Sequence, residues 1–160
     1  MALLPITTIP HVILRTKTQD VSVAEILTTE FQKLITDMVE TMHGADGIGL
    51  AAVQVGIAKR LCVVTTKDGV VAFINPRITK HSFRKEVLEE GCLSIPGVFG
   101  IVRRPKRIAL TAIDASGNPL TVTIDGMFAR IMQHEIDHLD GVLFTDKVIT
   151  ITKGERPNRT

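Results

Sequence analysis

Two histidines and a glutamate near the end of the chain have the spacing of a metal-dependent hydrolase. His134, Glu135 and His138 form the pattern H-E-x-x-H. On a helix, residues four apart share one face about 5–6 Å apart, so both imidazoles can chelate one metal ion. Glu135 is rotated by about 100° from the first histidine and can act as general base on a water that the metal holds. Because so short a pattern also arises by chance, the surrounding residues decide its meaning.

The residues before the motif predict a buried helix. Apolar residues and the two histidines recur there at helical spacing in two adjacent stripes: Met127, Ile131, His134 and His138, then Phe128, Met132, Ile136 and Leu139. Asp125 can cap the start of this helix, and Gly141 suits a left-handed residue after its end. Buried imidazoles need partners, and a metal ion is one way to provide them.

A catalytic metal site usually has three protein ligands and one open position, so a third ligand is needed. The chain contains two cysteines. Cys62 lies in a β-branched run that indicates a buried strand, and we interpret it as a small core residue. Cys92 is flanked by Gly91, Pro96 and Gly97, which indicate a shaped loop or strand end. A thiolate at that place could complete a Cys-His-His set.

Three sequence blocks resemble the peptide deformylase family and occur in that family's order. They are residues 47–54 (G-x-G-L-A-A-x-Q), residues 90–94 (E-G-C-L-S) and residues 133–138 (Q-H-E-x-D-H). Each block alone is weakly to moderately specific, whereas three in order are highly specific. The resemblance runs from about Pro10 to about Asp146. It implies a hydrolase that removes the formyl group from N-formylmethionyl nascent peptides and releases formate.

The resemblance implies that Cys92, His134 and His138 bind one divalent metal, with water in the fourth position. A metal of this kind lowers the pKa of the water from about 16 toward about 7. The thiolate favours Fe(II) or Zn(II) over Mg or Ca. The family makes Fe(II) the expected native metal, with Zn(II), Ni(II) or Co(II) able to substitute.

The resemblance also implies how the reaction proceeds. Glu135 takes the proton of the attacking water and passes it to the leaving amine. The Gln54 amide and the Leu93 backbone N–H stabilise the oxyanion together with the metal. Losing one such donor typically costs about 2.7–4 kcal/mol of transition-state stabilisation.

Further residues are expected around these reacting groups. The resemblance implies a substrate-binding set: Ile48, Gly49, Gly91, Met127 and Ile131. Within it, Ile48 lines the methionine pocket and pairs with the substrate main chain, while the Gly49 backbone contacts the formyl amide. Arg104 is expected to pair with Asp137 and orient the helix, and Glu90 to support the loop that carries the thiolate.

Length and composition narrow the setting. A chain of 160 residues is long enough for one domain with a real core, so we predict a single deformylase-like domain over residues 1–160. A formal net charge of +2 does not indicate binding to nucleic acid or to an anionic membrane, and the absence of Trp and Tyr makes base stacking an unexpected function. Two dissimilar cysteines and an N-terminus unlike a signal peptide indicate a cytoplasmic protein. No apolar run approaches the roughly 20 residues of a membrane span.

The order of predicted elements indicates an α+β fold. Residues 1–20 are expected to form an extended arm, and a capping box at residues 22–25 to open a helix that Gly44 can end. Residues 59–66 and 70–75 predict a hairpin whose second strand Pro76 ends or edges. Further strands are expected at residues 77–89, 98–104, 107–114 and 120–124. Strands between terminal helical segments indicate α+β, and the resemblance implies a central motif-bearing helix among small antiparallel or mixed sheets.

Two other functions fit the same motif. A zinc endopeptidase would need a third His or Glu ligand, but His138 is the last histidine of the chain. A non-catalytic metal- or peptide-binding module would not need Glu135, Gln54 and Cys92 together. The tail, residues 147–160, is short and polar, so we expect it to be extended and frayed. Because bacterial members of the family dock on the ribosome through a C-terminal helix, ribosome docking by that route is in doubt.

Overall fold

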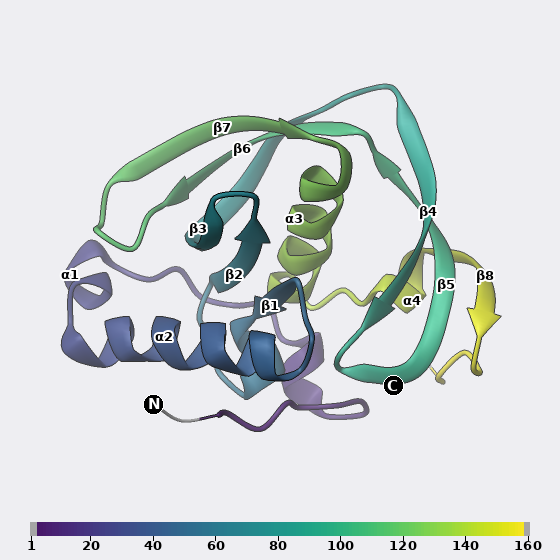
Figure 1. Cartoon of the computed structure of the whole chain (residues 1–160), viewed down its shortest axis with the longest axis horizontal. Coiled ribbons are helices and arrows are strands. Elements are labelled where there is room, and N and C mark those ends of the chain that lie inside the picture. The colour runs from purple at the N-terminus through teal and green to yellow at the C-terminus, as the bar shows by residue number, and fades with distance from the viewer. Residues whose placement is uncertain (1–2, 159–160) are drawn as a thin grey trace.

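Two antiparallel sheets with a helix between them form most of the protein, so the α+β prediction is confirmed (Figure 1). The computed structural model describes residues 3–158, and the outermost two residues of the predicted arm and of the predicted tail lie outside it. In chain order the elements are η1 (Val12–Arg15), α1 (Val23–Ile26), α2 (Thr29–Gly44), β1 (Gly49–Ala51), η2 (Ala52–Val55), β2 (Leu61–Thr66), β3 (Gly69–His81), β4 (Lys85–Cys92), β5 (Ile95–Pro105), β6 (Arg107–Ile113), β7 (Pro119–Asp125), α3 (Gly126–Leu139), α4 (Phe144–Lys147) and β8 (Val148–Lys153). The sheets have the strand orders β1-β2-β3-β6-β7 and β4-β5-β8. All of these described strand pairs are antiparallel, and neither sheet is mixed.

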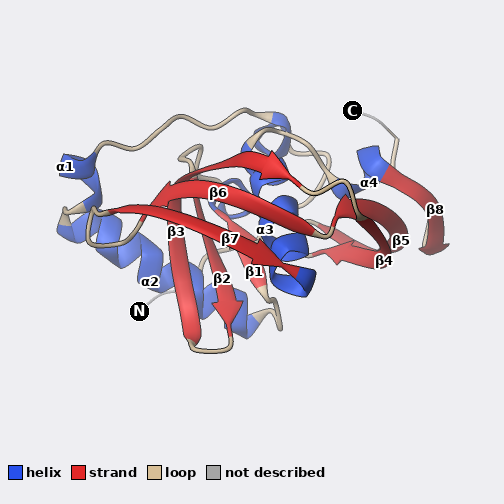
Figure 2. Ribbon diagram, turned by 90° about the horizontal axis from the view of Figure 1, so that it is seen from above, coloured by secondary structure: helices blue, strands red, loops and turns tan. Residues whose placement is uncertain are grey.

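The five-stranded sheet separates two layers of the core. Successive side chains of a strand point to opposite faces of its sheet. Accordingly, Leu61 and Val63 pack in the cluster that contains α2, while Cys62 and Val64 pack in the cluster that contains α3. Figure 2 shows α3 between this sheet and the β4-β5-β8 sheet. Because elements cover α3 on more than one side, it can be apolar around most of its girth. Cys62 is fully buried, which confirms its interpretation as a core residue.

Helix α3 begins and ends where the sequence indicates. Asp125 precedes its first turn, but the carboxylate makes no capping bond and pairs instead with Arg107 at 3.3 Å. Gly141 has φ 74°, as predicted for the residue after the helix end. A Cβ at Gly141 would lie 2.5 Å from the carbonyl oxygen of Arg15, so glycine is required there for space as well as for conformation.

The N-terminal helical segment is interrupted, and the prediction of one continuous helix to Gly44 is wrong. Ser22 accepts a hydrogen bond from the Glu25 N–H at 3.2 Å and starts α1 as predicted. The Thr28 hydroxyl then donates to the Glu25 carbonyl at 2.7 Å and accepts from the Phe31 N–H at 3.3 Å. Thr28 thereby ends one helix and caps the next.

No helix in the described part of the chain has the length and hydrophobicity needed to span a membrane.

Pro76 does not end its strand, contrary to the prediction. Strand β3 continues to His81, and its pairing with β6 shifts register between Ile74 and Arg77. A proline is tolerated at such a bulge because its missing N–H is not needed for the ladder. The Pro76 carbonyl accepts two bonds from the buried Arg60 guanidinium, at 3.1 and 2.9 Å.

The other strand predictions are confirmed with shifted ends. Residues 59–66, 98–104, 107–114 and 120–124 correspond to β2, β5, β6 and β7. The single strand expected at residues 77–89 is divided instead between the end of β3 and most of β4. The tight connection at residues 82–84 separates the two.

The predicted fraying of the tail is wrong for Val148–Lys153, which forms β8. This strand pairs with β5, and Val102 lies opposite Val148. Val148 is buried in a cluster with Phe144, so apolar contacts as well as backbone hydrogen bonds hold the strand. The N-terminal arm is also partly structured, because η1 interrupts it and buries Leu14 completely.

Adjacent residues of β8 test whether this strand stabilises the protein. We expect Val148→Ala to lower the free energy of unfolding by about 1–3 kcal/mol, because it removes buried methyl groups and leaves a cavity. Ile149→Ala is the matched control, since 57% of Ile149 is exposed, and should change stability by less than about 0.5 kcal/mol. Urea unfolding followed by circular dichroism measures both. Equal, small effects would show that the tail contributes nothing to the core.

Candidate active site

The structure brings Cys92 to the two histidines of α3. Cys92 ends β4, while His134 and His138 lie one turn apart on the helix. The ligand atoms that these residues offer lie within 4.8 Å of one another. The Cys92 Sγ is 3.1 Å from the His138 Nε2, and the two imidazole centroids are 4.9 Å apart. One sulfur and two ring nitrogens therefore converge from two separate elements.

The electrostatics of this group favour its anionic, metal-binding form. Burial alone would raise the pKa of the Cys92 thiol, but His138 and His134 outweigh it and hold that pKa well below its usual range. Burial likewise would lower the pKa of His134, but hydrogen bonds to Cys92 and Glu90 raise it to about 10. These shifts favour a thiolate at Cys92 and a proton on His134, and metal binding normally displaces such a proton.

The residues present fit a single divalent metal. A thiolate with two imidazoles is a donor set suited to zinc or iron and poorly suited to magnesium or calcium. Two buried side-chain atoms of the described residues lack a hydrogen-bond partner, Oε2 of Glu135 and Nδ1 of His138. Both belong to residues of the motif, and buried polar atoms without partners are costly. Unpartnered polar atoms destabilise the fold, so their presence in the motif favours a binding or catalytic role for these residues over a packing role.

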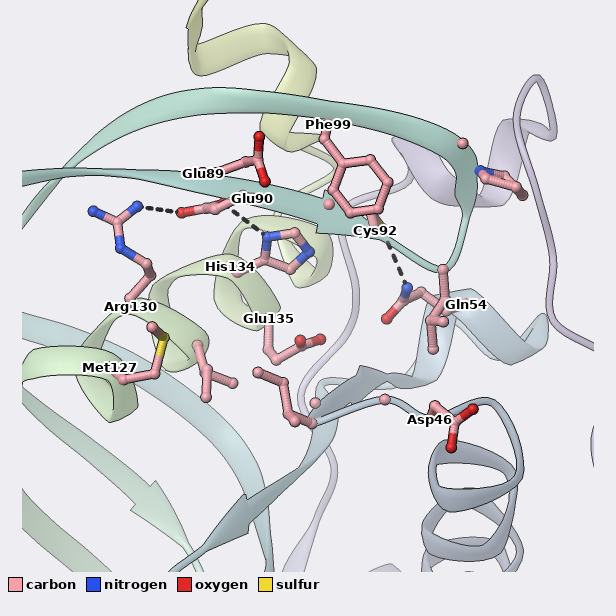
Figure 3. A pocket seen from close by; sticks show the side chains of 18 residues that line it. Asp46, Gln54, Glu89, Glu90, Cys92, Phe99, Met127, Arg130, His134 and Glu135 are labelled. Atoms are coloured by element: carbon pink, nitrogen blue, oxygen red, sulfur yellow. Dashed lines mark hydrogen bonds and ion pairs between the residues drawn. The ribbon is translucent and has the colours of Figure 1, made fainter. Parts of the chain in front are cut away.

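Glu135 lies beside the three donors and points into the same pocket (Figure 3). Burial raises the pKa of its carboxyl group, while His134 and His138 lower it, and the net shift is upward. A raised pKa suits a group that must both take and return a proton near neutral pH. Gly49 of β1 faces this carboxylate, and a Cβ there would lie 2.9 Å from the Glu135 Cδ. Glycine at position 49 therefore lets the strand approach the acid closely.

The Gln54 amide has a fixed orientation. Its Oε1 accepts a hydrogen bond from the Ala51 N–H at 2.9 Å, so its amino group must point the other way. That amino group lies 3.5 Å from the Cys92 Sγ (Figure 3). It also lies 3.2 Å from the Ser94 Oγ. Gln54 thus presents N–H donors to the space beside the sulfur. Leu93 follows Cys92 directly and also lines the pocket.

A cavity of about 550 Å³ opens beside the donors. All five residues of the predicted substrate-binding set line it: Ile48, Gly49, Gly91, Met127 and Ile131. Met127 and Ile131 come from the first turns of α3, one turn apart, and Ile48 precedes β1. These three residues give the cavity an apolar wall.

A charged network lies behind His134. Arg104 pairs with Asp137 at 2.8 Å, and with Glu90 at 2.6 Å through Nε. Glu90 in turn lies 3.0 Å from the His134 Nδ1. Burial would raise the pKa of Glu90, but His134 and Arg104 hold it well below its usual value, so the carboxylate is ionised. The network therefore orients His134 through Glu90 more directly than through Asp137.

Three residues near the site were not singled out from the sequence. Arg130 bonds Glu90 at 2.6 Å, Ser94 accepts from Gln54, and the Phe99 ring packs on Gly91, where a Cβ would lie 2.6 Å from it. Arg130 had a signal, since it lies four residues before His134 on the same helix face. Ser94 also had one, since it ends the block of residues 90–94 and lies two residues after Cys92. Phe99 had none, because only the folded hairpin of β4 and β5 brings it there.

The fold and the donor set define the class as a metal-dependent hydrolase with a Cys-His-His site and an acid beside it. The polypeptide deformylase family model matches residues 3–154. The chain belongs to this family, whose members hydrolyse N-formylmethionyl peptides. The deformylase interpretation is thereby supported over an endopeptidase or a non-catalytic module.

Individual relatives agree with this assignment. The chain is 46% identical over 149 residues to "Peptide deformylase 2" of Xanthomonas campestris, covering 91% of this chain and 87% of the relative. It is 43% identical to a peptide deformylase of Zymomonas mobilis, covering 96% and 90% of the two chains. The solved peptide deformylase of Thermotoga maritima superposes with a TM-score of 0.89 at 38% identity, covering 94% of this chain and all of that one. The fold and the sequence thus point to one family.

The two cysteines allow a matched test of the metal site. We expect Cys92→Ala to lose most of the bound metal, because the variant lacks the only sulfur among the three converging donors. Cys62→Ala should keep a stoichiometric metal, since Cys62 is buried in the core on β2. Elemental analysis of protein purified without oxygen measures the metal per chain. Full metal content in Cys92→Ala would contradict the assigned donor set.

Proposed function

We propose that this protein removes the formyl group from the N-formylmethionine of nascent polypeptides and releases formate. The observation that carries the proposal is the convergence of Cys92, His134 and His138 beside the Glu135 carboxylate at one end of an apolar pocket. A class I peptide deformylase of Acinetobacter baumannii, with a TM-score of 0.88 to this chain, was solved with Met-Ala-Ser bound. A peptide that begins with methionine is the product expected after deformylation.

In this proposal, one divalent metal is held by the Cys92 thiolate and by the imidazoles of His134 and His138. When bound, the metal supplies a positive charge that polarises the formyl oxygen and lowers the pKa of water. Fe(II) is the proposed native metal, and Zn(II), Ni(II) or Co(II) should substitute. The thiolate adds softness and negative charge to the site, which favours these ions over magnesium.

Glu135 carries the proton in the proposed reaction. Its carboxylate takes a proton from the attacking water as the water oxygen bonds to the formyl carbon. The carbon–nitrogen bond then breaks, and Glu135 delivers the proton to the amine that leaves as the new N-terminus. Water and the formamide group thus become formic acid and an amine, which leave as formate and the protonated amino terminus.

Gln54 and Leu93 stabilise the negative charge that develops on the formyl oxygen. The Gln54 amino group is already turned toward Cys92 by the bond between its Oε1 and the Ala51 N–H. The Leu93 backbone N–H is the second proposed donor. A donor that is fixed before the reaction needs no reorganisation when charge appears, which is why such groups lower barriers.

The pocket binds the methionine of the substrate. Its side chain would lie along Met127, Ile131 and Ile48, the apolar wall of the cavity. Strand β1 is the edge strand of its sheet, so its outer side has backbone groups available for a peptide. The Ile48 carbonyl is not one of them, because it accepts from the Thr65 N–H at 2.9 Å. Gly49 and Gly91 line the cavity, and their missing side chains let Glu135 and Phe99 pack directly against the backbone there.

The groups behind the site orient its ligands. Arg104, Asp137 and Glu90 would hold His134 so that its Nδ1–H donates to Glu90 and its Nε2 faces the metal. The single domain over residues 1–160 and the cytoplasmic compartment remain predictions, and ribosome docking through a C-terminal helix stays in doubt.

Matched peptides test the proposed reaction. With Fe(II) or Ni(II) under anaerobic conditions, the protein should release formate and a free amine from formyl-Met-Ala-Ser and leave Met-Ala-Ser intact. Formate is measured enzymatically, and peptide masses are read by mass spectrometry. Cleavage of Met-Ala-Ser between residues would support a zinc endopeptidase, and inertness toward both peptides would support a non-catalytic module.

Substitution of the proposed base separates metal binding from turnover. Glu135→Gln should keep the metal and lose turnover by about 10²-fold or more, because the amide cannot take the proton. Glu30→Gln is the control, since Glu30 lies in the first turn of α2, away from the site. Formate release and elemental analysis are measured on the same samples. Near wild-type turnover in Glu135→Gln would show that another group is the base.

A further inference from the structure

We propose that Arg130 is a positioning residue, which holds Glu90 against His134 and fixes the cysteine-bearing strand to the metal-binding helix. The proposal rests on the proposed function only in taking Cys92, His134 and His138 as the metal ligands. Arg130 is 5% exposed and lies on α3 one turn before His134.

The guanidinium of Arg130 joins three elements. Its Nη1 donates to the Glu90 Oε1 at 2.6 Å and to the Val102 carbonyl at 3.2 Å. Its Nη2 donates to the Glu86 carbonyl at 2.8 Å. Glu86 and Glu90 belong to β4, which ends at Cys92, and Val102 belongs to β5. One side chain of the helix thus bonds to two adjacent strands, β4 and β5, of the sheet that carries the thiolate.

The same contact decides which oxygen of Glu90 is left for His134. Oε1 accepts from both arginines, Arg104 Nε at 2.6 Å and Arg130 Nη1 at 2.6 Å. Oε2 accepts from Arg104 Nη2 at 2.9 Å and faces the His134 Nδ1 at 3.0 Å. With Oε1 fully occupied, Oε2 is the acceptor for the Nδ1–H of His134 (Figure 3). That bond fixes the tautomer and would leave Nε2 as the nitrogen that can hold a metal.

Arg130 and Arg104 hold the carboxylate from different elements. Arg104 reaches it from β5 and continues to Asp137, which follows His134 on the helix. Arg130 reaches it from the helix itself, four residues before His134. Without Arg130, Glu90 could rotate about Arg104, and two backbone carbonyls would lose a charged donor. We therefore expect the geometry of the metal ligands to loosen even while Arg104 stays in place.

The rate of metal loss tests this role without depending on turnover. We compare Zn(II)-loaded wild type with Arg130→Met, Arg130→Lys and the control Arg103→Met, which alters an exposed arginine next to Arg104 on β5. Zinc release to an excess of chelator is followed with a metal-sensitive dye. Arg130→Met should release zinc about 10–100-fold faster, the range typical of residues that orient metal ligands. Arg103→Met should match the wild type.

Arg130→Lys should fall between these values, because an ammonium can contact Glu90 but cannot reach the two carbonyls in the same fork geometry. Circular dichroism melting of each variant, beside Val148→Ala as a destabilised protein that keeps every ligand and ion pair of the site, separates loss of stability from loosening of the site. Zinc release at the wild-type rate from folded Arg130→Met would overturn the proposal. If Arg130→Met does not fold, wild-type release from Arg130→Lys overturns it. Failure of the deformylation assay would leave these release rates unaffected, so the two proposals fail separately.

Discussion

The approach of the Cys92 thiolate to two imidazoles is the constraint on which the rest of the structure depends. The sulfur is held by the end of a strand and the nitrogens by a helix, and these elements are far apart in sequence. Any movement of the strand relative to the helix changes the 3.1 Å distance between the Cys92 sulfur and the His138 nitrogen. The helix must therefore be packed from more than one side. Two sheets around α3 meet that requirement, and β8 extends one of them.

Buried charge is the second consequence of this constraint. The thiolate lies near a network of paired acidic and basic side chains, most of them almost fully buried: Glu90, Arg104, Asp137 and Arg130. Buried ion pairs of this kind often stabilise a fold no better than apolar residues of the same shape would. Their presence here is better explained by geometry, since each arginine links α3 to the β4–β5 hairpin. Desolvation of these charged side chains is unfavourable, but their ion pairs keep the metal ligands ordered.

The sequence was sufficient wherever a local rule decided the outcome. Helical spacing placed His134 and His138 on one face, and Gly141 ended the helix, because both follow from backbone geometry within one or two turns. The β-branched run around Cys62 indicated a core strand for the same reason. Cys92 was different, because spacing could suggest a ligand but could not bring it to the helix. The order of three motif blocks, taken as a family resemblance, supplied that pairing.

The errors share a physical cause, which is that a distant partner overrode a local preference. Pro76 stays within its strand because β6 accommodates a bulge there, and the polar tail becomes β8 because β5 offers an edge. Arg130 shows where sequence reasoning could have gone further. A helix predicted to be buried cannot leave a guanidinium unpaired, so Arg130 already required acceptors within the core. The sequence alone could not identify the acceptor, because Glu90 lies 40 residues away and only the packed hairpin brings it within reach of Arg130.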